Sequence, residues 1–84
     1  MSTLDASIRS ILQQHARLSA DAATLADDAN LYQAGMTSHA SVNLMLALEA
    51  AFDVEFPDAM LKRSVFQSVA SITEALQSLG ARAA

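Results

Sequence analysis

Apolar residues recur at helical spacing in three stretches of this chain, and the first lies near the N-terminus. Its apolar positions share one face of a helix; they are Leu4, Ile8, Ile11, Leu12 and Leu18. Ser2 or Thr3 can cap the start of this helix. The pattern fades at Leu18-Ser19, so we expect the first helix to end there.

The second stretch begins at Ser38 and ends at about Phe52. At about 100° per residue, one face becomes a core stripe; its members are Ser41, Leu44, Met45, Leu48 and Phe52. We expect Leu44, Leu48 and Phe52 to be buried against Leu12, Ile72 and Leu76 of the other helices. Leu46 falls on the opposite side with Asn43, so we expect this apolar residue to be exposed.

The third stretch starts at Ser68, which is placed to cap a last helix. Its apolar positions repeat at helical spacing up to Gly80, a good stop signal; they are Val69, Ile72, Ala75, Leu76 and Leu79. Before it, Pro57 and Asp58 can start a short helix through Met60, Leu61 and Lys62.

Residues 20–37 show no clean period and are predicted to form a long loop. Leu25, Leu31 and Tyr32 can attach this loop to the core. Gly35 is expected to adopt a backbone conformation that other residues resist.

Composition supports an all-α fold. The hydrophobic fraction is 52%, and two Gly and one Pro leave the chain with few helix breakers. We therefore predict a small four-helix bundle with three longer helices and one short helix. A chain of 84 residues makes one domain, residues 1–84, with its core at about 4–79.

Charge and cysteine content exclude several functions. A net charge of −4 argues against nucleic-acid binding and favours partners with basic docking patches. Without cysteine there is neither a disulfide nor a thiolate metal site, two histidines make a poor metal set, and Asp27-Asp28 is expected to be solvated loop charge. We expect no metal. No apolar run approaches the ~20 residues of a membrane span and no signal pattern is present, so the expected location is cytoplasmic.

An ordered set of motifs surrounds Ser38. Gly35 precedes the serine by three residues, and the serine opens the second helix. The rest of the set follows in the order Val42-Asn43-Leu44, Leu48-Glu49, Phe52, Phe56-Pro57-Asp58 and Ser68-Val69 with Ile72. Over roughly residues 4–79, this set resembles the acyl and peptidyl carrier proteins of fatty-acid, polyketide and nonribosomal-peptide pathways.

In that family the serine at this position bears a 4′-phosphopantetheine arm, which derives from coenzyme A. The resemblance implies that Ser38 is the attachment site and that the chain is a discrete, monomeric carrier of an acyl or aminoacyl thioester. It implies three kinds of partner: a phosphopantetheinyl transferase, an adenylate-forming acyl or aminoacyl ligase, and a downstream transferase or synthase. The cargo stays open between fatty acyl and aminoacyl groups.

Two departures from the family pattern affect docking. The family usually has Asp-Ser-Leu at the attachment site, where this chain has Thr37-Ser38-His39, and only Glu49 remains of the glutamates that often line the second helix. We therefore expect partners to dock by apolar and neutral contacts. The expected docking residues are Gly35, Met36, Thr37, His39, Val42, Asn43 and Leu46.

Ser38 also has simpler interpretations than a carrier attachment site. Taken alone, a serine at a helix start is a cap. His39 beside Ser38 suggests a nucleophile and base, but adjacent helical residues point about 100° apart and no G-x-S-x-G motif is present. We expect no enzyme activity. The alternative to a carrier is a helical protein-interaction module that keeps the carrier fold and is never modified.

Overall fold

The structure is a computed structural model that describes residues 3–15, 18 and 24–81. Within these ranges it contains four α-helices, a 3-10 turn and no strand. The helices are α1 (Thr3–His15), α2 (Ser38–Phe52), α3 (Arg63–Phe66) and α4 (Val69–Ser78), and the 3-10 turn is Asp58–Met60. The predicted all-α class is confirmed. None of the described helices has the length and apolar character needed to cross a membrane.

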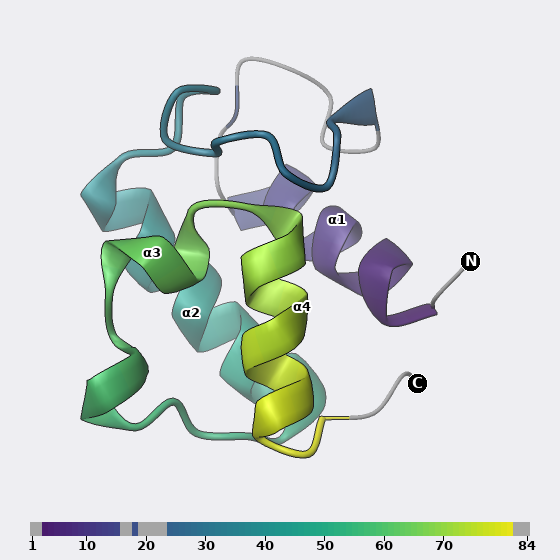
Figure 1. The fold of residues 1–84 in the computed structure, drawn as a ribbon, viewed down its shortest axis with the longest axis vertical. Coiled ribbons are helices and arrows are strands. Elements are labelled where there is room, and N and C mark those ends of the chain that lie inside the picture. Colours follow the sequence, from purple (N-terminus) through teal and green to yellow (C-terminus); the bar gives the residue numbers. More distant parts are fainter. Residues whose placement is uncertain (1–2, 16–17, 19–23, 82–84) are drawn as a thin grey trace.

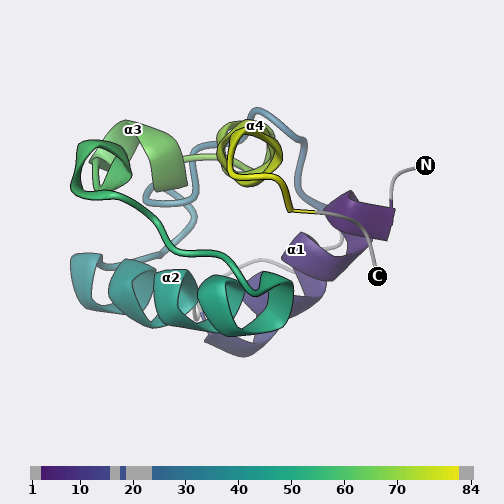
Figure 2. The same cartoon turned by 90° about the horizontal axis from the view of Figure 1, so that it is seen from below.

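The helices pack in two layers. In Figure 2, α3 and α4 lie on one side of the molecule and face α2 on the other. Helix α1 packs against both α2 and α4, and α3 packs against α4 (Figures 1 and 2). The core therefore lies between α1, α2 and α4.

Each long helix buries residues at the spacing that the sequence predicts. Leu12 of α1, Leu44 and Leu48 of α2, and Ile72 and Leu76 of α4 are all 0% exposed. Burial of side chains of this size supplies the main driving force for folding. These residues confirm the central part of the predicted core stripes.

The margin of the predicted stripe on α2 is different. Phe52 is only half-buried, because it is the last residue of α2 and packs at the edge of the core cluster. The expectation that it is buried like Leu44 and Leu48 is wrong. Ala40 is buried instead, and it extends the inward-facing row of Leu44 and Leu48 by one turn toward Ser38.

Two element boundaries differ from the prediction. The described part of α1 is Thr3–His15, and Leu18, near which the helix was expected to end, lies outside any helix and packs partly against the core; Ser2 and Ser19 fall outside the described residues. The single short helix predicted from Pro57 to Lys62 is a 3-10 turn, followed by α3. A four-residue helix has no repeating apolar face, so periodicity does not reveal it.

Buried aromatic packing holds the segment around α3. The rings of Phe56 and Phe66 meet edge to face, with centroids 5.3 Å apart, and both residues are 5% exposed. Their contact brings the chain after α2 back over the core and sets the position of α3.

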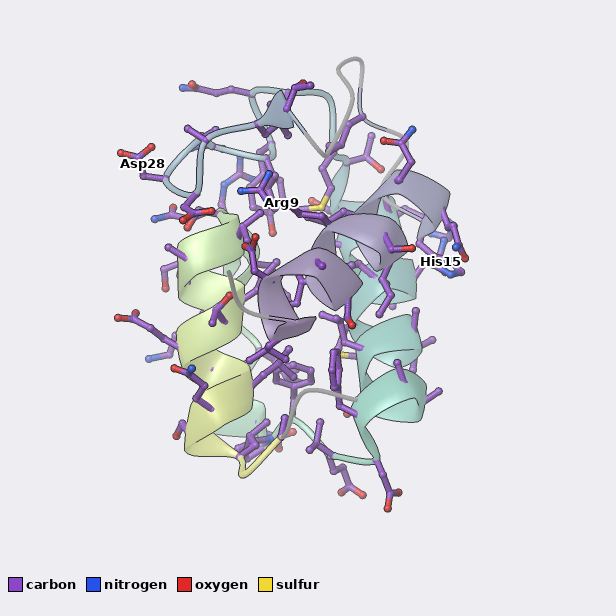
Figure 3. All side chains as sticks on the ribbon, turned by 90° about the vertical axis from the view of Figure 1, so that its right-hand side faces the viewer. Arg9, His15 and Asp28 are labelled. Atoms are coloured by element: carbon purple, nitrogen blue, oxygen red, sulfur yellow. The ribbon has the colours of Figure 1, made fainter. Side chains whose placement is uncertain are left out.

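Arg9 attaches the loop before α2 to the helices. Its guanidinium donates to the carboxylates of Asp5 and Asp27 and, at 2.6 Å, to the carbonyl oxygen of Leu25. The carbonyl of Asp27 accepts from the amide of Ala70 at 2.9 Å. In Figure 3, Arg9 lies between α1 and the loop, whereas Asp28 points outward. Both carboxylates are exposed, as expected for this pair, and Asp27 in addition forms an ion pair with Arg9.

Arg9 stays charged in this position. Burial by itself lowers the pKa of Arg9, but the hydrogen bonds to Asp27 and Asp5 outweigh it, so the pKa of Arg9 is raised above its ordinary value. The ion pairs therefore do not depend on the protonation of Arg9 at any pH at which the protein is folded.

Two leucines on α2 provide a test of the core. Leu48 is 0% exposed and Leu46 is 54% exposed. Leu48→Ala should lower the free energy of unfolding by about 2–5 kcal/mol, because it opens a cavity that the bundle cannot fill. Leu46→Ala should change it by no more than about 0.5 kcal/mol. Urea unfolding followed by circular dichroism measures both values, and equal losses would mean that the stripe on α2 is assigned to the wrong face.

Candidate functional site

Ser38 is the first residue of α2, but Thr37 caps the helix. The side-chain oxygen of Thr37 accepts a hydrogen bond from the amide of Ala40 at 3.0 Å, and the Thr37 backbone is extended. Ser38 is exposed. The interpretation of Ser38 as a plain cap is therefore wrong, and its hydroxyl is not used to complete the helix.

A tight turn precedes the serine. Gly35 has φ +117°, which side chains resist, so the expectation for this glycine is confirmed. The amide of Met36 donates to the carbonyl of Leu31 at 3.0 Å across this turn. Leu31 is 0% exposed and Met36 is 3% exposed, so the turn places a buried residue on each side of Gly35.

The burial of Met36 corrects the expected docking surface. Met36 was expected to contact partners near the arm, but its side chain belongs to the core cluster. The turn that exposes Gly35 directs the next residue inward. The other six expected residues are exposed; they are Gly35, Thr37, His39, Val42, Asn43 and Leu46.

Three of the exposed docking residues line two different grooves. Val42 lines a groove with Ser38, and this groove has a volume of about 440 Å³. Asn43 and Leu46 line a second hollow with His15, which projects from the end of α1 (Figure 3). Helix α2 thus presents its exposed face between the groove beside Ser38 and the end of α1.

The groove beside Ser38 is lined partly by residues that the sequence pattern does not connect with Ser38. Its walls are Tyr32, Ser38, Ser41, Val42, Met45, Leu61, Lys62, Arg63 and Phe66. The guanidinium of Arg63 lies 3.8 Å from the centroid of the Tyr32 ring, at cation–π distance. In the sequence, the only sign of this groove is the pair of adjacent basic residues Lys62-Arg63 after Leu61, which is exposed. Only the fold places this pair near Ser38.

Glu49 has a structural role in the motif. Its carboxylate accepts a hydrogen bond from the amide of Phe56 at 2.9 Å. This bond fixes the chain after α2, where Asp53 adopts a left-handed conformation with φ +53°. The one glutamate on α2 therefore stabilises the turn toward α3.

The geometry around Ser38 offers no assembled catalytic group within the described residues. Ser38 and His39 are successive exposed residues of α2, and no hydrogen bond joins their side chains in the described part of the chain. Nor do the residues that the structure describes bring together three His, Cys, Asp or Glu side chains that could hold a metal ion. What the site presents is an exposed hydroxyl at the rim of a groove.

Comparison with known proteins identifies the family. Residues 6–76 match the family model described as "Phosphopantetheine attachment site". The chain belongs to this family of carrier proteins. The resemblance found in the sequence and the covalent cofactor that it implies, 4′-phosphopantetheine, are confirmed. Carrier proteins of this family are generally not catalytic.

Curated and solved carrier proteins are similar to this chain. The aminoacyl carrier protein of Agrobacterium fabrum (strain C58) is 46% identical over 74 residues, which cover 88% of this chain and 89% of that protein. A carrier protein from Agrobacterium tumefaciens, crystallised with an engineered Bradyrhizobium japonicum glycine:[carrier protein] ligase and AMP, is 46% identical with a TM-score of 0.84. The match covers 87% of this chain and 97% of that one.

A second similar structure contains a glycylated carrier protein. It is the Bradyrhizobium japonicum glycine:[carrier protein] ligase complexed with glycylated carrier protein, and the match is 32% identical with a TM-score of 0.73. It covers 86% of this chain and 96% of that one. These similarities confirm the small helical bundle as the fold of this carrier protein.

The cap of α2 can be tested without touching the serine. Thr37→Val removes the side-chain acceptor for the amide of Ala40 and should lower the free energy of unfolding by about 0.5–2 kcal/mol. Thr37→Ser keeps a hydroxyl and should change the free energy of unfolding by only about a few tenths of a kcal/mol. Thermal and urea unfolding of the three proteins give the comparison; equal stability of the Val and Ser variants would show that Thr37 does not cap α2.

Proposed function

We propose that Ser38 bears the 4′-phosphopantetheine arm and that the protein presents an aminoacyl group, held as a thioester on that arm, to partner enzymes. The observation that carries the proposal is the exposed Ser38 hydroxyl at the first position of α2, next to a threonine that caps the helix in its place. Since the chain has no cysteine, the thiol must come from the arm.

An aminoacyl cargo is favoured over a fatty acyl cargo. The similar proteins are named as aminoacyl carriers, and one similar carrier is glycylated. A small amino acid with a charged ammonium group needs no long apolar tunnel. The core leucines of this bundle are fully packed, and the groove beside Ser38 is open to solvent along part of its wall.

An adenylate-forming ligase is the proposed loading partner. When attached, the arm would supply the thiol that accepts the aminoacyl group from an aminoacyl adenylate, with loss of AMP and of the thiol proton. A similar carrier is solved with a ligase and AMP, which supports this assignment. A phosphopantetheinyl transferase would attach the arm, and a downstream transferase or synthase would accept the cargo. A cytoplasmic location and a monomeric state stay predictions.

The proposed docking surface is the exposed side of α2 near Ser38. It comprises Gly35, Thr37, His39, Val42, Asn43 and Leu46, without Met36. Between Ser38 and Glu49 the helix carries no Asp, Glu, Lys or Arg. Val42 is 50% exposed and Leu46 is 54% exposed, so a partner can bury apolar surface there without separating an ion pair.

Attachment of the arm at Ser38 can be measured directly. Incubation of the unmodified protein with coenzyme A and a broad-specificity phosphopantetheinyl transferase should add one phosphopantetheine, seen as a single mass increment. Ser38→Ala should take up none. Ser41→Ala is the matched control, because Ser41 lies one turn further along α2 and lines the same groove, and this variant should be modified normally.

Peptide mass spectrometry locates the modified residue. Modification of a different serine, or none with any transferase, would contradict the carrier function and leave the unmodified interaction module as the alternative.

Docking on α2 can be tested by placing a charge on its apolar surface. Leu46→Asp should fold almost as stably as the wild type, because Leu46 is exposed. It should lower kcat/KM for loading with glycine by the Bradyrhizobium japonicum ligase about tenfold or more, because a charge in a desolvated contact is costly. Gln77→Glu on α4 adds a negative charge away from α2 and should load normally.

Salt dependence separates apolar docking from charge-driven docking. Loading of the wild type should change little as the salt concentration rises, because the contacts on α2 are mostly uncharged. Wild-type loading that collapses with salt, together with normal loading of Leu46→Asp, would show that charged residues elsewhere direct docking.

A further inference from the structure

The groove beside Ser38 is basic, although the protein as a whole is acidic. The net charge is −4, yet Lys62 and Arg63 both line this groove. Within the described part of the chain neither forms an ion pair, whereas Arg9 is paired with Asp5 and Asp27. The exposed carboxylates of the described residues lie outside the groove lining; they are Asp27, Asp28, Asp53, Glu55, Asp58 and Glu74.

Arg63 is held in place at the rim of the groove. Its guanidinium stacks on the ring of Tyr32, 3.8 Å from the centroid, and the amide of Tyr32 donates to the side-chain oxygen of Asn30 at 2.9 Å. Stacking uses the face of the guanidinium and leaves its in-plane N–H donors pointing away from the ring. A preorganised fork of this kind suits a phosphate group.

The other walls of the groove are mainly apolar. Val42 and Met45 come from α2, and Leu61 and Phe66 come from the facing segment. A volume of about 440 Å³ lies within the range of small-molecule sites. Phosphopantetheine has one anionic phosphodiester at its root, and one methylene further along the arm is an apolar carbon with two methyl groups. The groove can match both parts of the arm: its two cations suit the phosphodiester, and its apolar wall suits the methyl groups. Both lie beside the Ser38 hydroxyl.

We propose that Lys62 and Arg63 bind the phosphodiester of the arm and hold the root of the arm against the apolar wall formed by Val42, Met45 and Leu61. This inference rests on the proposed attachment at Ser38. Lys62 and Arg63 are positioning residues, which restrict where the arm lies before a partner takes it up. Because Val42 also belongs to the proposed docking surface, a partner that covers Val42 competes with the arm for the same side chain.

The test compares amide spectra of the protein before and after modification. Two-dimensional ¹⁵N–¹H spectra are recorded for the wild type, Lys62→Gln, Arg63→Gln, Lys62→Arg and Gln77→Glu, each with and without the arm. In the wild type, attachment should shift the amide signals of residues 61–66 as well as those near Ser38. The charge-removing variants should reduce the shifts in 61–66 about two- to fivefold, the range that an exposed ion pair can supply.

Three controls separate charge from structure. Lys62→Arg keeps the charge and should retain the wild-type shifts. Gln77→Glu makes the net charge one unit more negative, as Lys62→Gln does, but on α4, and should also retain them. High salt should reduce the wild-type shifts in residues 61–66, because it screens a phosphate from exposed cations. Spectra of the unmodified variants check that each one is folded, as expected for substitutions at exposed positions.

The outcomes distinguish this inference from the carrier function on which it rests. Intact mass first establishes whether Ser38 carries the arm, and a serine that accepts no arm overturns both proposals. If the wild type is modified but its shifts stay within the first turn of α2, only the proposal that the arm binds in the groove is overturned. Shifts in residues 61–66 that are equal in the wild type, Lys62→Gln and Arg63→Gln overturn the role of the basic pair.

Discussion

The presentation of Ser38 depends on how the loop before α2 is attached to the helices. The described part of this loop, residues 24–37, has no α-helix of its own, and Arg9 joins it to α1 through Asp27 and the carbonyl of Leu25. Its backbone also bonds to the C-terminal half of the chain, where the amide of Leu31 donates to the carbonyl of Gln67 at 2.7 Å. Without these bonds the turn at Gly35 and the start of α2 would have no fixed position, since an unanchored loop retains its conformational entropy.

The two sides of α2 have different tasks. Ala40, Leu44 and Leu48 bury the inner side, and this burial holds the helix against α1 and the rest of the core. The outer side does not pack against the core, so Val42 and Leu46 can remain exposed. A carrier needs a rigid base under an accessible attachment point, and a short bundle supplies both because one face of the helix is enough to stabilise it.

The distribution of charge follows the same division. The carboxylates are spread over the exterior, and the outer face of α2 is almost neutral. The basic pair Lys62-Arg63 stands apart from both, across the groove from α2. The electrostatic surroundings of Ser38 therefore come from a segment distant in sequence, and the helix that carries the serine contributes little to them.

Much of this protein was predictable from its sequence, because regular patterns record which face of a helix meets the core. The spacing of Leu44, Leu48, Ile72 and Leu76 identified two helices and their buried faces, and the motifs around Ser38 indicated the family. The prediction that Gly35 adopts a backbone conformation that other residues resist also followed from local reasoning, because glycine has no Cβ.

Only the tertiary structure decided the contacts of those segments that have no regular spacing of apolar residues. Three features depend on the path of the chain around the core, and no local spacing encodes them: the burial of Met36, the pairing of Asp27 with Arg9 and the position of α3. That Thr37 and not Ser38 caps α2 has a related reason, because competing hydrogen bonds and not the apolar stripe decide where a helix starts. The basic groove became visible only when folding brought Lys62 and Arg63 opposite Ser38: side-chain periodicity describes each helix singly, whereas a groove is formed by the packing of one segment against another.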